Sequence, residues 1–102
     1  MNIEDLLNKA NRDPGDYALC RMVGSSKKIL GVVDKNEISN QKEKLVCYVL
    51  KEDLNVFEAN DVFDIYFDDE HDVPSMKMQI IESCSCVPFF GWDYHYHIAP
   101  KR

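Results

Sequence analysis

Four potential metal ligands lie near the end of the chain. Cys84 and Cys86 are separated by one residue, and His95 and His97 repeat this spacing further along. Two thiolates and two imidazoles form a suitable ligand set for tetrahedral Zn²⁺. These residues therefore form a candidate zinc site, provided that the fold brings all four side chains to one face.

The segment 76–98 has the pattern of two strands joined by a tight turn. Pro88-Phe89-Phe90-Gly91 suits a four-residue loop, because proline begins a type I turn and glycine readily takes the left-handed position that follows. The expected cross-strand pairs are Val87 with Trp92, Cys86 with Asp93, Cys84 with His95, and Glu82 with His97. Because side chains alternate between the two faces of a strand, this register puts both cysteines and both histidines on one face.

A competing interpretation places the same hairpin in the core. One face of the first strand carries Met76, Met78, Ile80, Cys84 and Cys86, and one face of the second carries Trp92, Tyr94, Tyr96 and Ile98. If these two faces coincide, a bulge or a one-residue change of the loop is required and the histidines point to solvent. Cysteine is often buried as a small apolar residue, and Cys-x-Cys is not the usual ligand spacing of zinc ribbons. The core interpretation is therefore favoured, with the zinc site as its alternative.

An enzymatic role is not predicted. A cysteine and a histidine can act as nucleophile and base, but that chemistry also needs a third group that orients the base. The chain contains no recognisable nucleophile motif or phosphate-binding loop. We therefore expect a protein without catalytic residues.

The charge of the chain is uneven. Its net charge is −6, yet residues 52–102 carry 11 acidic and 3 basic side chains. Such a surface disfavours direct binding of nucleic acid, whose phosphates select Lys and Arg, and favours a basic protein partner. The proposed partner-binding residues are the acidic and aromatic side chains Asp61, Asp64, Tyr66, Asp68, Asp69, Glu70, Asp72, Phe89 and Phe90.

Length and composition bound the class of protein. The 102 residues suit a single domain spanning 1–102, and 45% hydrophobic residues argue against disorder. The acidic N-terminal segment lacks the basic and apolar runs of a signal peptide, and no apolar run is long enough to span a bilayer. We expect a cytoplasmic protein whose four cysteines are reduced.

The hydrophobic pattern predicts an α+β fold. Ile3, Leu6, Leu7 and Ala10 form a stripe at helical spacing after the potential N-cap Asn2. Strand patterns follow at 17–23, 28–33, 45–50, 61–68 and in the two arms of the last hairpin, while 34–43 looks like a polar loop. Gly31 inside a strand indicates a bulge or a close backbone approach. The expected fold is a short helix packed on about six mostly antiparallel strands, as a sheet or small barrel.

The favoured functional hypothesis is a small acidic interaction module, such as an inhibitor, an immunity-type protein or a nucleic-acid mimic, docking on a basic partner. One alternative is a zinc-binding module that uses Cys84, Cys86, His95 and His97. Another is a barrel that binds a small ligand through Trp92, Tyr94 and Tyr96. The favoured hypothesis needs no cofactor and no membrane, and it leaves a homodimer open.

Overall fold

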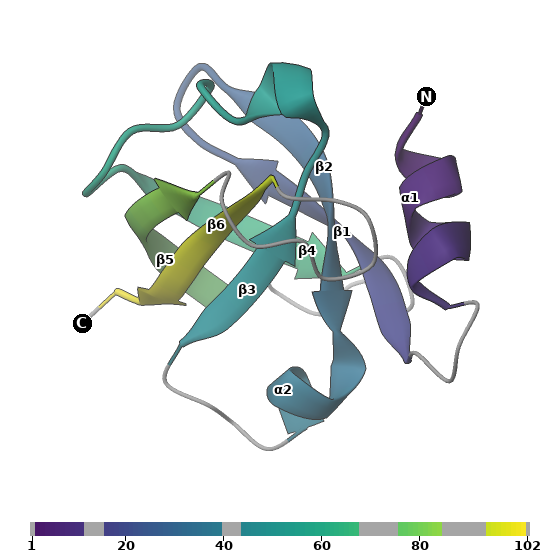
Figure 1. The fold of residues 1–102 in the computed structure, drawn as a ribbon. Helices are drawn as coiled ribbons and strands as arrows, with labels where there is room; N and C mark the ends of the chain where they lie inside the picture. Colours follow the sequence, from purple (N-terminus) through teal and green to yellow (C-terminus); the bar gives the residue numbers. More distant parts are fainter. Residues whose placement is uncertain (1, 12–15, 40–43, 68–75, 85–93, 102) are drawn as a thin grey trace.

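Six antiparallel strands close into a barrel in the order β1-β2-β3-β6-β5-β4 (Figure 1). The computed structural model describes residues 2–11, 16–39, 44–67, 76–84 and 94–101. The strands are β1 (Tyr17–Val23), β2 (Lys28–Asp34), β3 (Leu45–Tyr48), β4 (Val62–Phe67), β5 (Met76–Cys84) and β6 (His95–Pro100). Together with the N-terminal helix, this confirms the predicted α+β fold. Of the two forms that the sequence allows, a sheet or a small barrel, the structure has the barrel.

Apolar side chains that alternate along the strands fill the barrel. The buried core consists of Ala18, Cys20, Met22, Ile29, Val33, Leu45, Cys47, Val49, Phe57, Phe63, Ile65, Met78, Ile80, Tyr96 and Ile98. The alternation predicted for β4 is present, because Phe63 and Ile65 are buried while Asp64 between them is partly exposed. A strand with one buried and one exposed face requires this period of two.

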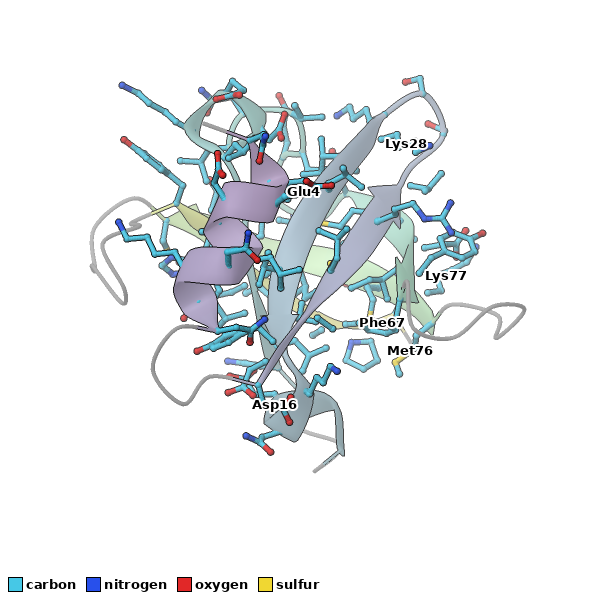
Figure 2. All side chains as sticks on the ribbon, turned by 90° about the vertical axis from the view of Figure 1, so that its right-hand side faces the viewer. Glu4, Asp16, Lys28, Phe67, Met76 and Lys77 are labelled. Carbon is cyan, nitrogen blue, oxygen red and sulfur yellow. The ribbon has the colours of Figure 1, made fainter. Side chains whose placement is uncertain are left out.

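Helix α1 (Ile3–Ala10) covers the outside of the barrel where β1 and β2 pair (Figures 1 and 2). Its buried residues Ile3, Leu6 and Ala10 pack on Tyr17 and Val32, which face away from the barrel interior. An eight-residue helix is marginal in water by itself, so this packing is what holds it. The predicted cap is also confirmed: Asn2 Oδ1 accepts a hydrogen bond from the Asp5 amide at 2.9 Å.

The segment expected to be a loop at 34–43 contains a short helix, α2 (Lys35–Ser39). Its polar sequence shows no apolar stripe, so hydrophobic periodicity could not reveal it. Local and tertiary hydrogen bonds hold it instead. Asp34 Oδ1 accepts from the Asn36 amide at 2.8 Å, and Glu37 Oε2 accepts from the Val46 amide of β3 at 3.3 Å.

The connection from β3 to β4 closes one end of the barrel. It contains the 3₁₀ helix η1 (Lys51–Asp53) and then places Phe57 in the core, against Phe63 and Tyr96. The Tyr96 hydroxyl donates to the Asp53 carbonyl at 2.5 Å and accepts from the Phe57 amide at 3.2 Å. Residues 54–59, which follow η1, contain neither a strand nor an α-helix.

Among the described residues, none of the helices is long and apolar enough to cross a membrane.

Candidate metal centre on the outer face of β5 and β6

The expected register of the last hairpin is confirmed over its described part. Cys84 lies opposite His95, and Glu82 lies opposite His97. The turn at 88–91 and the expected pairs of Val87 with Trp92 and Cys86 with Asp93 lie outside the described residues. The ladder therefore places one cysteine and both histidines on the same outer face.

A β-bulge makes this arrangement compatible with a packed core. Ile80 pairs with Ile98, both fully buried, and the register then shifts by one residue before Glu82. Ile81, the inserted residue, is 42% exposed. A bulge returns the chain to the opposite alternation, so Cys84 leaves the face that Ile80 occupies. The two alternatives drawn from the sequence, a shared core face and a shared ligand face, thus hold together in successive parts of one strand.

The potential ligand atoms converge. One ligand atom each from Cys84, His95 and His97 lie within 4.8 Å of one another. The Nε2 atoms of His95 and His97 are 3.3 Å apart. Two imidazole nitrogens on one tetrahedral zinc ion, each about 2.05 Å from it, would be about 3.3 Å apart. The histidine pair therefore already has the spacing that a shared zinc ion requires.

Glu82 is a further potential ligand, which the ligand set chosen from the sequence did not include. Its Oε1 atom lies 3.8 Å from His97 Nε2, and its side chain is 62% exposed. An exposed carboxylate can rotate toward an ion at little cost, and carboxylate oxygen is a normal zinc ligand. Its cross-strand position opposite His97 was the signal available in the sequence. Cys86, the other candidate for this position, lies outside the described residues.

An aromatic wall lies beside the candidate ligands. His95 is only 6% exposed, and its ring lies 5.7 Å from that of Tyr48, which in turn lies 6.3 Å from Tyr17. Burial raises the pKa of Tyr48 to about 12, and the nearby Tyr17, Glu37 and Asp34 add to the effect. The phenol thus stays neutral at physiological pH. It limits the movement of the His95 ring without adding negative charge.

The predicted acidic surface is only partly within the described residues. Asp68, Asp69, Glu70, Asp72, Phe89 and Phe90 lie outside them. Asp61 is engaged within the chain, because its Oδ2 atom accepts from Lys27 Nζ and from the Glu58 amide, each at 2.9 Å. These hydrogen bonds, with that of the Glu58 amide as the larger cause, lower the pKa of Asp61. Asp61 therefore has a structural role in the connection before β4.

Basic side chains neighbour the other two described residues of that surface. The Arg21 guanidinium lies 5.1 Å from the centre of the Tyr66 ring, a cation–π contact. Asp64 lies opposite Lys77 in the β4–β5 ladder. The part of the acidic surface carried by β4 is thus interspersed with cations, and docking on a basic partner stays a prediction.

Of the aromatic residues expected to line a ligand site, the two that the structure describes lie in the packed core or against it. Tyr96 is fully buried in the packed core, and Tyr94 packs partly buried against it. Trp92 lies outside the described residues. With its hydroxyl hydrogen-bonded to two backbone groups, Tyr96 is a core residue that holds η1 in place.

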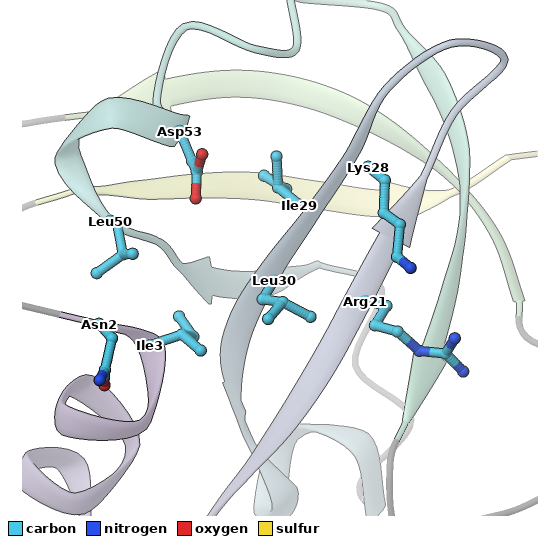
Figure 3. A pocket seen from close by; sticks show the side chains of 8 residues that line it. All are labelled: Asn2, Ile3, Arg21, Lys28, Ile29, Leu30, Leu50 and Asp53. Atoms are coloured by element: carbon cyan, nitrogen blue, oxygen red, sulfur yellow. The ribbon is translucent and has the colours of Figure 1, made fainter.

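A shallow hollow of about 480 Å³ lies between the start of α1, β2 and η1 (Figure 3). Its apolar walls are formed by Ile3, Leu30 and Leu50. Asn2, Lys28 and Asp53 also line it, and Arg21 at its rim turns away from it (Figure 3). A ligand site usually adds a few converging polar groups to such walls. The candidate metal centre has such groups, since three ligand atoms there lie within 4.8 Å of one another.

Comparisons of the chain with protein-family models, curated proteins and solved structures found no match.

Proposed function

We propose that the protein is a zinc-binding module in which Cys84, His95 and His97 hold the ion on the outer face of β5 and β6. The observation that carries the proposal is the convergence of three ligand atoms within 4.8 Å, with the histidine nitrogens 3.3 Å apart. Thiolate sulfur and imidazole nitrogen together favour zinc over magnesium or calcium, which prefer oxygen.

Cys84 and His95 lie at facing ends of two paired strands. Cys84 ends β5 and His95 begins β6, so an ion between them links the two strands across the segment 85–94. Binding to the folded state alone stabilises it, by about 2.7 kcal/mol when free zinc is a hundredfold above its dissociation constant. We expect zinc to raise the melting temperature and to protect the ends of both strands from hydrogen exchange.

The identity of the fourth ligand determines whether the site is structural or open to an external ligand. If Glu82 or Cys86 completes the tetrahedron, the site is closed and structural, whereas three protein ligands plus water leave a position open to an external ligand. Glu82 is the described candidate, since its carboxylate lies 3.8 Å from His97 Nε2. Separate Glu82→Gln and Cys86→Ser variants distinguish these cases, because only the true ligand weakens zinc binding when it is replaced.

Metal analysis and competition titration test the proposal. Protein purified without added zinc should contain about one zinc per chain, and Cys84→Ser or His97→Gln should weaken affinity by at least about a hundredfold, more than the loss of an outer-shell partner costs. His71→Gln is the matched control, since His71 is the third histidine of the chain and is not among the proposed ligands. Equal zinc affinity in all of these variants would overturn the proposal.

We retain docking on a basic protein surface as a second proposal. Its support is the charge of residues 52–102, with 11 acidic and 3 basic side chains, because fields of opposite sign steer association. The two proposals are compatible, since the metal centre uses β5 and β6 while the described acidic residue Asp64 lies on β4.

A further inference from the structure

Three sulfur atoms meet inside the barrel, away from the zinc ligands. Cys47 Sγ lies 3.6 Å from Cys20 Sγ and 3.6 Å from Met22 Sδ. All three residues are fully buried. Cys20 and Met22 come from β1 and Cys47 comes from β3, so the sulfurs approach one another across the intervening strand β2.

Gly31 on β2 provides the space for this approach. It pairs with Cys20, and a Cβ atom at this position would lie 2.3 Å from Cys47 Sγ and 3.5 Å from Cys20 Sγ. Any larger residue would therefore overlap the Cys47 thiol. The same Cβ atom would lie 3.1 Å from the Tyr48 carbonyl oxygen, which is the close backbone approach that a glycine inside a strand predicts.

We propose that Cys20, Met22 and Cys47 form a second metal site, selective for a soft univalent ion such as Cu(I). Thiolate and thioether ligands together favour Cu(I) over harder ions. The observed 3.6 Å between the thiols is well beyond the bond length of a disulfide, about 2.05 Å. The 3.6 Å between Cys47 Sγ and Met22 Sδ is close to the separation of about 3.8–4.0 Å for two sulfurs that each lie about 2.3 Å from one ion, the length of a zinc–thiolate bond.

Charge balance selects a univalent ion. Cu⁺ replaces the proton of the Cys47 thiol, forming a copper–sulfur bond and releasing H⁺, and the Met22 thioether coordinates as a neutral ligand. The Cys20 thiol keeps its proton and donates a hydrogen bond to the Cys47 sulfur, 3.6 Å away. The net charge of the buried site is the same before and after this exchange. An apolar interior strongly disfavours uncompensated charge, so an exchange of one cation for one proton suits this core.

Access to the site is through the shortest ladder of the barrel. The β2–β3 ladder contains two residue pairs, Val32 with Tyr48 and Val33 with Cys47, whereas β1 and β2 share seven. Local opening of proteins uses regions with few stabilising contacts. Separation of β2 from β3 would expose Cys47, so we expect copper to enter slowly in the folded protein and rapidly during refolding.

The test uses a variant without the other thiols. Cys84→Ser with Cys86→Ser leaves Cys20 and Cys47 as the remaining cysteines and removes the zinc-site thiolate, so the result is independent of the zinc proposal. This protein is refolded with Cu(I) under anaerobic reducing conditions and titrated against a coloured Cu(I) chelator. We expect one tightly bound Cu(I) per chain.

Three substitutions in that background locate the ion. Met22→Leu conserves volume and should weaken binding by about tenfold or more, whereas Met78→Leu, at another fully buried methionine, should not change it. Cys47→Ala should remove the site. Absence of tightly bound Cu(I), or equal affinity in the Met22→Leu and Met78→Leu variants, would overturn the proposal.

Discussion

Cys84 faces His95 across the β5–β6 ladder because the register shifts between Ile80 and Glu82. Before the shift, Ile80 points into the core with Ile98. After it, the same strand presents its cysteine on the outside. One inserted residue therefore separates the part of the hairpin that stabilises the barrel from the part that gathers potential ligands.

Deleting Ile81 should retain zinc binding. The deletion removes the bulge and joins Ile80 directly to Glu82, so Ile80 still faces Ile98 and Cys84 still faces His95. Removing a side chain that is 42% exposed also costs little burial. Competition titration should give a zinc affinity within about threefold of the unmodified protein, far less than the tenfold or greater effect of losing ligand support. A folded deletion variant that no longer binds zinc would show that the bulge itself shapes the site.

Gly31→Ala should destabilise the barrel by about 1–3 kcal/mol, as overpacking of a core does. The added methyl group would lie 2.3 Å from Cys47 Sγ, which cannot move far within a packed interior. In Cys47→Ala protein the same substitution should cost less, because the clashing atom is absent. Urea denaturation of the two single variants and the double variant measures this coupling. Gly24→Ala is a control away from the sulfurs, where the added methyl group would meet the Phe57 ring at 3.1 Å and Lys27 Cβ at 3.8 Å. Additive free energies in the cycle would contradict the steric account.

Local patterns in the sequence predicted the elements that bury one face. The stripe of Ile3, Leu6 and Ala10 predicted α1, and alternation around Phe63 and Ile65 predicted β4. The sequence does not decide between an open sheet and a closed barrel. Closure depends on pairing of β1 with β4 and of β3 with β6, strands far apart in the chain whose contacts leave no local pattern.

One of the two candidate sites could be predicted in part from local sequence, and the other could not. The pair Cys84–His95 was predicted because a hairpin register follows from the length of its turn. The sequence allows a bulge only as an alternative to that register, since no feature of the residues around Ile81 marks an insertion. The sulfur cluster of Cys20, Met22 and Cys47 was not predicted, because it forms across three strands and depends on the missing side chain of Gly31.

Tyr96→Phe should lower the free energy of unfolding by about 1–3 kcal/mol, the cost of leaving a buried hydrogen-bonding group unsatisfied. The lost hydroxyl accepts from the Phe57 amide and donates to the Asp53 carbonyl, and both groups hold the connection that closes the barrel. Thermal denaturation measures the loss, and hydrogen exchange at the Phe57 amide should increase. Unchanged stability and exchange would show that the hydroxyl is not needed to hold this segment.

Docking on a basic partner should depend on salt. Raising the ionic strength from 0.1 to 1 M shortens the Debye length from about 10 to about 3 Å, so contacts made by exposed carboxylates should weaken strongly. Replacing Asp64, Asp68 and Asp69 by Asn should reduce partner capture from a native lysate at low salt, whereas Glu4→Gln with Asp16→Asn, in the other half of the chain, should not. Capture that persists in high salt, or that survives the triple substitution, would exclude this surface.

Metal-free protein should lose stability between about pH 10 and pH 12, in part through Tyr17 and Tyr48. Burial, as the largest cause, raises the pKa of each phenol from 10.0 to about 12 in the folded state. The folded protein therefore keeps these protons at pH values where the unfolded chain releases them. Their contribution to the free energy of unfolding is complete below pH 10 and lost as the pH rises to 12.

Tyr48→Phe has no proton to release at this position, so its stability should decline less steeply over that interval. Urea denaturation at pH 7, 10 and 11.5 measures the difference, with the pH 7 value as the internal reference because both phenols are neutral there. Parallel declines in the two proteins would show that Tyr48 does not carry the alkaline sensitivity.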